Sequence, residues 1–246
     1  MKIIEELVQG SEEWFTHRLC KVTASDAKRL MTAKTCKASA QRSDVMAELI
    51  AERRIPSGVD AETMCKYTGK KFIGNVFTDH GNEMEPVARE SWLETVGGPS
   101  GLTVKEVGMV VRDDDFIACS PDGLIYSGDI AISGLEIKCK CLKEHVKVVK
   151  SGELPDEHKA QCHWSMIVCG FDSWVFYSYF PGEQPFHTIV KRDDYTAKME
   201  AVIDQFIIDY AIYQRDVEDQ LLIKAPDSIS IEMLVNDTSV LEGGLI

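Results

Sequence analysis

One stretch of the sequence, residues 120–140, constrains the fold more than any other. It reads S-P-D-G-L-I-Y-S-G-D-I-A-I-S-G-L-E-I-K-C-K, in which a Pro-Asp-Gly turn precedes two apolar runs typical of paired strands. Because side chains alternate between the two faces of a strand, Glu136 and Lys138 share one face and their apolar neighbours face the core. The stretch therefore predicts an antiparallel pair of strands that brings the turn acid, Asp122, close to Glu136.

The periodicity of apolar residues along the rest of the chain indicates a mixed α/β protein. Helical spacings of three and four residues alternate with runs rich in β-branched residues. We expect a central mixed β-sheet flanked by helices. The expected helices are two short ones capped by Ser11 and Ser25 and longer ones over residues 43–53, 79–95, 155–169 and 193–213. The other expected strands cover residues 104–112, 116–119, 173–180 and 186–191.

Length and composition favour one domain. A chain of 246 residues, 44% of them hydrophobic, can bury one substantial core. We expect a single domain over residues 1–225 and an acidic tail over residues 226–246. No run of eighteen apolar residues and no signal-peptide pattern is present, so we expect a cytoplasmic protein with no membrane partner. The eight cysteines lack C-x-x-C spacing, which favours buried, reduced thiols.

Charge is unevenly distributed along the chain. A formal net charge of −13 argues, taken alone, against a nucleic-acid partner, because phosphate binding normally uses a basic surface. Acidic residues crowd the C-terminal region, however, and residues 138–150 carry a cluster of lysines. Because local charge decides binding, the net charge does not exclude DNA. The lysines form either a solvated helix face or a track for DNA.

The acids of residues 120–140 suit a divalent metal. Mg²⁺ prefers one or two carboxylates together with waters and substrate phosphate oxygens, and Asp122 and Glu136 can converge on such an ion. Lys138 beside it could orient or deprotonate an attacking water, and the carbonyl of Ile137 could add a ligand. The alternative is a solvated cross-strand ion pair between Glu136 and Lys138 with no catalytic role.

The wider sequence supports the metal hypothesis. Asp122 followed by Glu136-x-Lys138 resembles the active-site pattern of the restriction-endonuclease-like nucleases. Over residues 9–192, the chain resembles the lambda exonuclease family of phage recombination nucleases. The matching blocks are Q-G-S-E-E-W (9–14), R-L (18–19), V-T-A-S (22–25), G-N-E-M-E (81–85), A-C-S-P-D-G-L (118–124), L-E-I-K-C (135–139), A-Q (160–161) and S-M (165–166).

This resemblance implies a metal centre and a pocket for the end of a DNA strand. Two Mg²⁺ ions, for which Mn²⁺ can substitute, are implied as cofactors. The residues implied at the metal centre are Asp122, Glu136, the backbone carbonyl of Ile137, Glu85 through a water, and Lys138 and Gln161, which position the attacking water. The residues implied in the pocket for a terminal 5′-phosphate are Arg18, Ser25, Ser120 and Gln161. An arginine fork and a helix N-terminus both suit a phosphate.

Several of these residues also have an ordinary structural explanation. Glu85 could be a solvated residue on a helix face, and Arg18 could be a salt-bridge partner on an amphipathic helix. Ser25 could serve only as an N-cap. Gln161 could be a polar residue of the helix that contains it.

The activity implied by the resemblance is that of a DNA exonuclease. Such an enzyme hydrolyses one strand of linear double-stranded DNA in the 5′-to-3′ direction from a 5′-phosphorylated end, releases mononucleotides and leaves a 3′ overhang for recombination by strand annealing. The family also implies a ring-shaped homotrimer and a single-strand annealing protein as partner. It places an apolar wedge near residues 78–80, which are polar here, although Val76 or Phe77 could substitute.

Three other functions fit parts of the sequence. One is a related repair nuclease for single-stranded or branched DNA, although the cysteine spacing counts against the iron–sulfur cluster that some such enzymes carry. Another is a catalytically inactive subunit that binds DNA ends, against which the intact set of Asp122, Glu136 and Lys138 argues. The third is an Mg²⁺ enzyme acting on a nucleotide or another small phosphoester.

Overall fold

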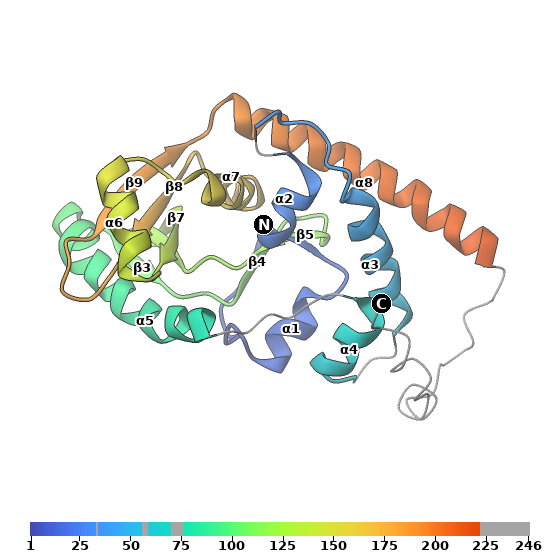
Figure 1. The fold of residues 1–246 in the computed structure, drawn as a ribbon, viewed down its shortest axis with the longest axis horizontal. Helices are drawn as coiled ribbons and strands as arrows, with labels where there is room; N and C mark the ends of the chain where they lie inside the picture. The colour runs from blue at the N-terminus through green and yellow to red at the C-terminus, as the bar shows by residue number, and fades with distance from the viewer. Residues whose placement is uncertain (33, 56–58, 70–75, 222–246) are drawn as a thin grey trace.

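The computed structural model of the chain describes residues 1–32, 34–55, 59–69 and 76–221. These residues form two mixed β-sheets with helices around them, which confirms the expected α/β class (Figure 1). The larger sheet lies at one end of the molecule, and α3 (Arg42–Arg54) and α4 (Ala61–Thr68) lie at the other. The tail expected over residues 226–246 lies outside the described residues.

The larger sheet contains, in spatial order, β3 (Thr103–Lys105), β6 (Gly123–Ser127), β7 (Ile130–Lys138), β8 (Ser173–Ser178) and β9 (Phe186–Lys191). β6 and β7 form the antiparallel pair that the sequence predicts, and β7 pairs with β8 in parallel. Gly134 of β7 lies against Trp174 of β8, where a Cβ would come within 2.1 Å of the indole ring. The two strands therefore need a residue without a side chain at this position.

The smaller sheet contains, in spatial order, β1 (Lys2–Ile4), β4 (Met109–Val111), β5 (Ile117–Cys119) and β2 (Val22–Thr23). The single strand expected over residues 104–112 is therefore wrong, because β3 and β4 belong to different sheets. The chain changes sheets next to Gly108, where a Cβ would come within 2.4 Å of the carbonyl oxygen of Leu7. Gly108 and Leu7 lie far apart in the sequence, so no local pattern predicts this contact.

Helices surround the two sheets. In addition to α3 and α4, they are α1 (Glu12–Arg18), a 3₁₀ turn (Ala24–Asp26) that leads into α2 (Ala27–Leu30), α5 (Val76–Trp92), α6 (Leu142–Ser151), α7 (Asp156–Cys169) and α8 (Asp194–Leu221). Ser11 caps α1 as expected, since its Oγ accepts a hydrogen bond from the amide of Trp14 at 3.2 Å. The cap before α2 is instead Thr23, in a capping box with Asp26, so the prediction that Ser25 caps this segment is wrong.

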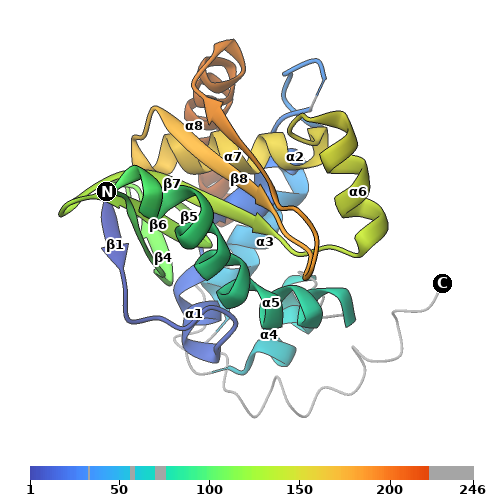
Figure 2. The ribbon, with the colours of Figure 1, turned by 90° about the vertical axis from the view of Figure 1, so that its left-hand side faces the viewer.

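α7 contacts strands of both sheets, and most of its residues are buried. Trp164 donates a hydrogen bond from its indole nitrogen to the carbonyl of Ala118 in β5 at 2.9 Å. Gly170 ends the helix with a positive φ of 68°, which glycine adopts without strain. Figure 2 shows α7 crossing behind β8, between α8 and α2.

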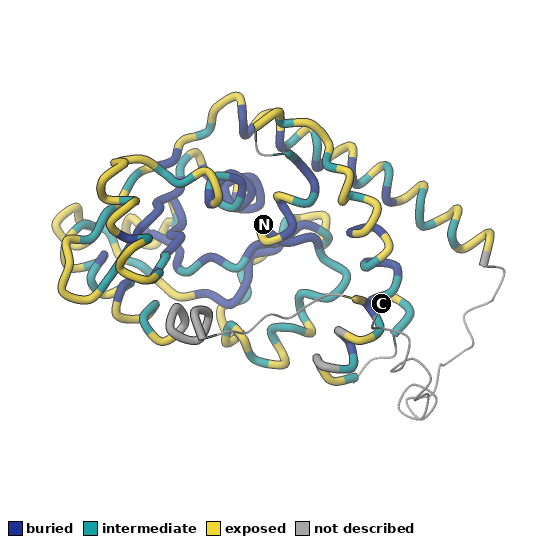
Figure 3. The backbone as a smooth tube through the Cα atoms, viewed as in Figure 1, coloured by how far each residue is buried: buried dark blue, intermediate teal, exposed yellow. Residues whose placement is uncertain are grey.

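The core has two main parts on either side of β7. Leu135 and Ile137 belong to a buried cluster with Ala88 and Trp92 of α5. Because side chains alternate along a strand, Glu136 faces away from that cluster, toward the side of the sheet covered by α7. Figure 3 shows buried residues concentrated in the central strands and α7. Glu136 of β7 is one of these buried residues.

Two further sequence expectations concern the membrane and the cysteines. Within residues 1–221, as far as they are described, no helix is long and apolar enough to cross a lipid bilayer. Each cysteine whose side chain is described is a free thiol. The expectation that the thiols are buried is wrong for Cys141, which is exposed, and for Cys20 and Cys36, which are only partly buried.

Candidate active site

Asp122 lies in the turn between β5 and β6 and is tied to β7 by two hydrogen bonds. Its amide donates to the carbonyl of Leu135 at 3.1 Å, and its Oδ2 accepts from the amide of Ile137 at 2.6 Å. The prediction that the turn acid comes close to the Glu136 strand is therefore correct. Both bonds involve the backbone, so the carboxylate is held by the sheet itself.

Glu136 and Lys138 lie on one face of β7, as the period of two requires. The ammonium of Lys138 pairs with Oε1 of Glu136 and donates a second hydrogen bond to the carbonyl of Ile137 at 3.1 Å. The side chain of Glu136 is only 1% exposed, and that of Lys138 is 23% exposed. The pair therefore joins a buried acid to a partly buried cation within one strand, which is not the solvated cross-strand pair considered as an alternative.

Burial sets the protonation of this cluster. It raises the pKa of Glu136 to about 7, with the charge of Lys138 opposing the shift and that of Asp122 adding to it. The pKa of Asp122 is likewise raised by burial and lowered in part by Lys138. Burial also acts to lower the pKa of Lys138, but the two carboxylates outweigh it and raise the pKa above its ordinary value. Two acids, of which Glu136 is fully buried, thus share one partly buried cation.

Glu85 approaches the cluster from α5. Its Oε1 accepts a hydrogen bond from Arg89 at 2.6 Å, and its side chain is 24% exposed. Burial raises the pKa of Glu85 to about 8, and the charge of Asp122 is the next largest cause. Glu85 is therefore not an ordinary solvated residue of a helix face, and it experiences the field of the acids on the sheet.

The oxygen atoms of these residues fit a hard cation. In the described part of the chain, no three side chains of the His, Cys, Asp and Glu types are grouped closely enough to hold a metal. The available oxygen donors are instead the carboxylates of Asp122 and Glu136 and the carbonyl of Ile137. The ammonium of Lys138 already donates hydrogen bonds to Glu136 and to the carbonyl of Ile137, which shows that these two oxygens accept a cation. An oxygen-only donor set with two carboxylates matches the preference of Mg²⁺ for few protein ligands.

Gln161 lies on α7, which covers the same face of the sheet. Its neighbour Cys162 has a pKa raised by burial and by the charge of Glu136, which places this part of α7 beside the acids. No hydrogen bond joins the Gln161 side chain to another predicted site residue among those described.

Arg18, Ser25 and Ser120 come together, although they are far apart in the chain. The guanidinium of Arg18 donates to the hydroxyl of Ser25 at 3.0 Å, to that of Ser120 at 3.3 Å and to that of Thr23 at 3.0 Å. It forms no ion pair with any described residue, so it is not the salt-bridge partner considered as an alternative. Burial lowers the pKa of Arg18, but a guanidinium remains charged.

Two residues beside Arg18 had no site role predicted from the sequence. Thr23 shares its hydroxyl with Arg18, and Trp14 lies under the guanidinium, 4.3 Å from its ring centroid. The indole nitrogen of Trp14 also donates to Ser120 at 3.1 Å. The signal for Trp14 was its spacing of four residues from Arg18, which places both on one face of α1.

A cavity of about 370 Å³ opens beside Arg18. It is lined by Phe15, Arg18, Leu19, Ser25, Asp26, Arg29, Glu48, Glu52, Met64 and Gly69. Arg29 is neutralised by Glu48, with which it forms two hydrogen bonds of 2.7 Å. Among the residues that line this cavity, Arg18 is thus the cation whose hydrogen bonds all go to hydroxyl groups.

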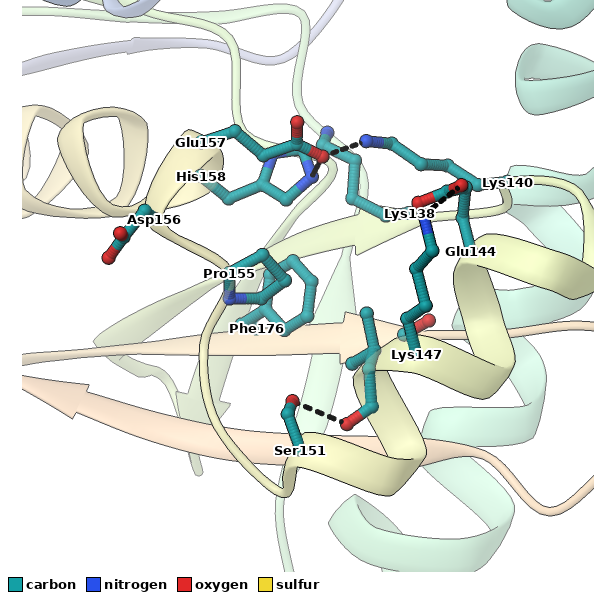
Figure 4. A pocket seen from close by; sticks show the side chains of 12 residues that line it. Lys138, Lys140, Glu144, Lys147, Ser151, Pro155, Asp156, Glu157, His158 and Phe176 are labelled. Carbon is teal, nitrogen blue, oxygen red and sulfur yellow. Dashed lines mark hydrogen bonds and ion pairs between the residues drawn. The ribbon is translucent and has the colours of Figure 1, made fainter.

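A second cavity, of about 440 Å³, lies between α6 and α7 (Figure 4). Lys138 borders it, and Lys140 and Lys147 are among its lining residues. Lys140 pairs with Glu157, and Lys147 pairs with Glu144 at 2.8 Å. These two lysines of the basic cluster are therefore partly neutralised, whereas Lys138 faces the acids.

The chain resembles a known protein family and a known structure. The sequence matches the family described as the YqaJ-like viral recombinase domain over residues 13–172. The structure is similar to the crystal structure of an alkaline exonuclease, LHK-Exo, from Laribacter hongkongensis, with 30% identity and a TM-score of 0.67 over 86% of this chain and 98% of that one. The structure of LHK-Exo in complex with dAMP gives the same values. No curated protein matches the sequence.

Proposed function

The chain belongs to the YqaJ-like viral recombinase family, the lambda exonuclease family of nucleases, and we propose that it is an Mg²⁺-dependent exonuclease for linear double-stranded DNA. It degrades one strand from a 5′-phosphorylated end in the 5′-to-3′ direction. The products are mononucleotides and a 3′ single-stranded overhang that serves recombination by strand annealing.

One observation carries this proposal: a single turn contributes to both parts of the site. Ser120 contacts Arg18, and Asp122, two residues later, is tied to the strand of Glu136 and Lys138. The Cα atoms of residues two apart in an extended chain are at most about 7 Å apart. A phosphate held by Arg18 therefore binds beside the turn that carries Asp122. That arrangement suits removal of the terminal nucleotide.

The metal-binding residues in this proposal are Asp122, Glu136 and the carbonyl of Ile137, with Glu85 acting through a water. When bound, two Mg²⁺ ions, or Mn²⁺ in their place, supply positive charge for the attacking and leaving oxygens. Their charge also suits acids whose pKa burial has raised, because a cation favours the ionised form.

Lys138 and Gln161 position the attacking water. The carboxylates of Glu136 and Asp122 raise the pKa of Lys138, which supports a role for its ammonium in donating hydrogen bonds to the water and offsetting phosphate charge. Gln161 has both a donor and an acceptor in its amide and can bind a water from α7.

Arg18, Ser25 and Ser120, with Gln161 near them, recognise the terminal 5′-phosphate. A guanidinium can bind a phosphate through two parallel hydrogen bonds, and the hydroxyls of the serines, together with Thr23, can donate to the remaining oxygens. The complex of LHK-Exo with dAMP supports a site that accommodates a single nucleotide.

The assembly completes the proposal. Residues 1–225 form one nuclease domain, and three copies form a ring around the DNA with a single-strand annealing protein as partner. The side chains near residues 78–80, where an apolar wedge would split the duplex, lie outside the described residues.

The test is digestion of a linear duplex with 5′-phosphates in Mg²⁺ and in EDTA. We expect release of nucleotides in Mg²⁺ only, and loss of cleavage with retention of DNA-end binding in Glu136→Ala and Lys138→Ala. The substitution Arg112→Ala, which removes a guanidinium that pairs with Asp114, is the control and should digest DNA normally. Digestion by Glu136→Ala at the wild-type rate would overturn the site.

A further inference from the structure

Arg89, a residue of α5, lies where three segments of the chain meet beside the acids. Its Nε donates to the carbonyl oxygen of Asp122 at 2.7 Å. One terminal nitrogen donates to Glu85 at 2.6 Å, and the other donates to Glu106 at 2.8 Å. The side chain is only 11% exposed. A single buried group thus links the turn before β6, α5 and the linker between β3 and β4.

Arg89 completes the immobilisation of Asp122. The amide of Asp122 is bound to Leu135, its Oδ2 is bound to the amide of Ile137, and its carbonyl is bound to Arg89. Its other carboxylate oxygen, Oδ1, has no hydrogen bond to a described residue. Every other polar atom of this residue is therefore fixed, and Oδ1 is the oxygen left for a ligand.

Only an arginine can make this set of contacts. Its three nitrogens lie in one plane and point to separate acceptors, whereas a lysine ammonium is a single nitrogen at the end of a flexible chain. The two acids linked by Arg89 also repel each other when both are ionised, and the charge of Asp122 helps to raise the pKa of Glu85. A fixed positive charge between them reduces that repulsion.

We propose that Arg89 is a positioning residue of the metal centre, which holds the carbonyl of Asp122 and the carboxylate of Glu85 together and so sets the separation of two acids that serve one cation. This inference rests on the proposed function, since the acids are metal ligands only there. Glu106 is the outer anchor of Arg89, is 57% exposed, and contributes less.

Binding of Mn²⁺ alone, followed by its EPR signal, tests this role apart from DNA cleavage. Arg89→Lys keeps the charge but loses the three-way contact, so we expect Mn²⁺ binding to weaken by about 10- to 100-fold, the usual effect of removing a residue that orients metal ligands. We expect kcat for DNA to fall by a similar factor while KM for DNA stays within about twofold, because the end pocket is untouched. Glu106→Gln should change either quantity by less than about threefold.

Arg192 provides a matched control. Its Nε donates to the carbonyl of Phe171 at 2.9 Å and a terminal nitrogen donates to Glu200 at 2.8 Å, so its contacts resemble those of Arg89. It lies at the opposite end of β8 from the site, since the residue before it pairs with Ser173 whereas Lys138 pairs with Ser178. Arg192→Lys should lower thermal stability but leave Mn²⁺ binding unchanged.

The outcomes separate the two proposals. Weaker Mn²⁺ binding in Arg89→Lys but not in Arg192→Lys supports the role of Arg89, even if the wild-type protein digests no DNA and the proposed function fails. Equal Mn²⁺ affinity in the wild-type protein and Arg89→Lys would overturn it. So would equal losses in both arginine variants, or no Mn²⁺ binding by the wild-type protein.

Discussion

Arg18 is a half-buried cation whose direct partners are hydroxyl groups. Thr23, Ser25 and Ser120 accept its hydrogen bonds, and Trp14 covers one face of the guanidinium. A buried charge normally has a carboxylate partner, because neutral groups compensate it only in part. The arrangement is therefore suited to an anion that arrives from outside, such as a terminal phosphate.

The first prediction concerns that anion. Arg18→Ala should abolish the preference for 5′-phosphorylated over 5′-hydroxyl duplex ends, because a hydrogen bond to a charged group contributes about 1.5–3 kcal/mol. The preference should therefore fall by about 10- to 100-fold in the ratio of initial digestion rates. Arg112→Ala, which removes a guanidinium that pairs with its neighbour Asp114, should keep the wild-type ratio. An unchanged ratio in Arg18→Ala would remove Arg18 from end recognition.

Glu136 makes the folding stability of the metal-free protein depend on pH. Burial raises the pKa of Glu136 to about 7 from an ordinary value of 4.5 in the unfolded chain. Between these values the folded state binds the proton more strongly than the unfolded state does. The contribution of Glu136 to stability is therefore highest below pH 4.5 and falls as the pH rises to about 7.

The second prediction follows from this sign. Glu136→Gln imitates the protonated acid, so in EDTA its Tm relative to wild type should rise from pH 5 to pH 8 by about 3 °C or more. Saturating Mg²⁺ should raise the wild-type Tm more at pH 8 than at pH 5, and should raise that of Glu136→Gln less. Differential scanning calorimetry at both pH values measures these shifts. A constant difference between the two proteins would contradict the raised pKa.

Single residues were predictable from sequence where a local pattern carries them. The Asp122, Glu136 and Lys138 set follows from a turn and a strand of period two. Arg89 and Thr23 had no such signal. Arg89 binds a backbone carbonyl 33 residues away, and Thr23 is a helix cap whose hydroxyl also accepts a hydrogen bond from Arg18. Hydrogen bonds of this kind depend on tertiary structure.

At the scale of elements, β7 is the strand on which the site is built. α5 covers one of its faces and α7 covers the other, while β6 and β8 flank it. The site residues Glu136 and Lys138 are therefore held by packing on both faces of the sheet. Gly134, two residues before Glu136, sets how closely β8 approaches through its contact with Trp174.

The third prediction tests that contact. Gly134→Ala should destabilise the protein by about 1–3 kcal/mol, the usual cost of overpacking, because its methyl group would overlap the Trp174 ring. Urea denaturation measures the loss. Trp174→Leu makes room for the methyl group, so the double variant should lose less stability than the sum of the two single variants. Strict additivity would show that the two residues do not meet.

Element prediction succeeded where the pattern was regular and failed where it was short. The β6–β7 pair, α3, α7 and the two last strands lie close to their expected positions, and α8 extends further than expected. α4 and α6 were missed as elements, and the expected 104–112 strand is divided between two sheets. That division depends on the approach of Gly108 to Leu7, which no local spacing encodes.

At the scale of the whole molecule, the turn of residues 120–122 joins the two parts of the site. Gln9, from the N-terminal segment, donates to the carbonyls of Pro121 and Val107 at 2.9 Å each, and Arg89 holds the carbonyl of Asp122. The proposed end pocket is built mainly by α1 and the segment before α2, whereas Glu136 belongs to the larger sheet and Asp122 directly precedes β6. Neither half is complete without this turn.

The first labelled product from a duplex carrying ³²P at its 5′ ends tests this arrangement most directly. A phosphate pocket that shares the turn of residues 120–122 with the acids predicts that the wild-type protein releases the label as a mononucleotide from the earliest time point in Mg²⁺. Labelled oligonucleotides as the first product would contradict the account, because the end pocket and the cutting site would then be separated by more than one nucleotide.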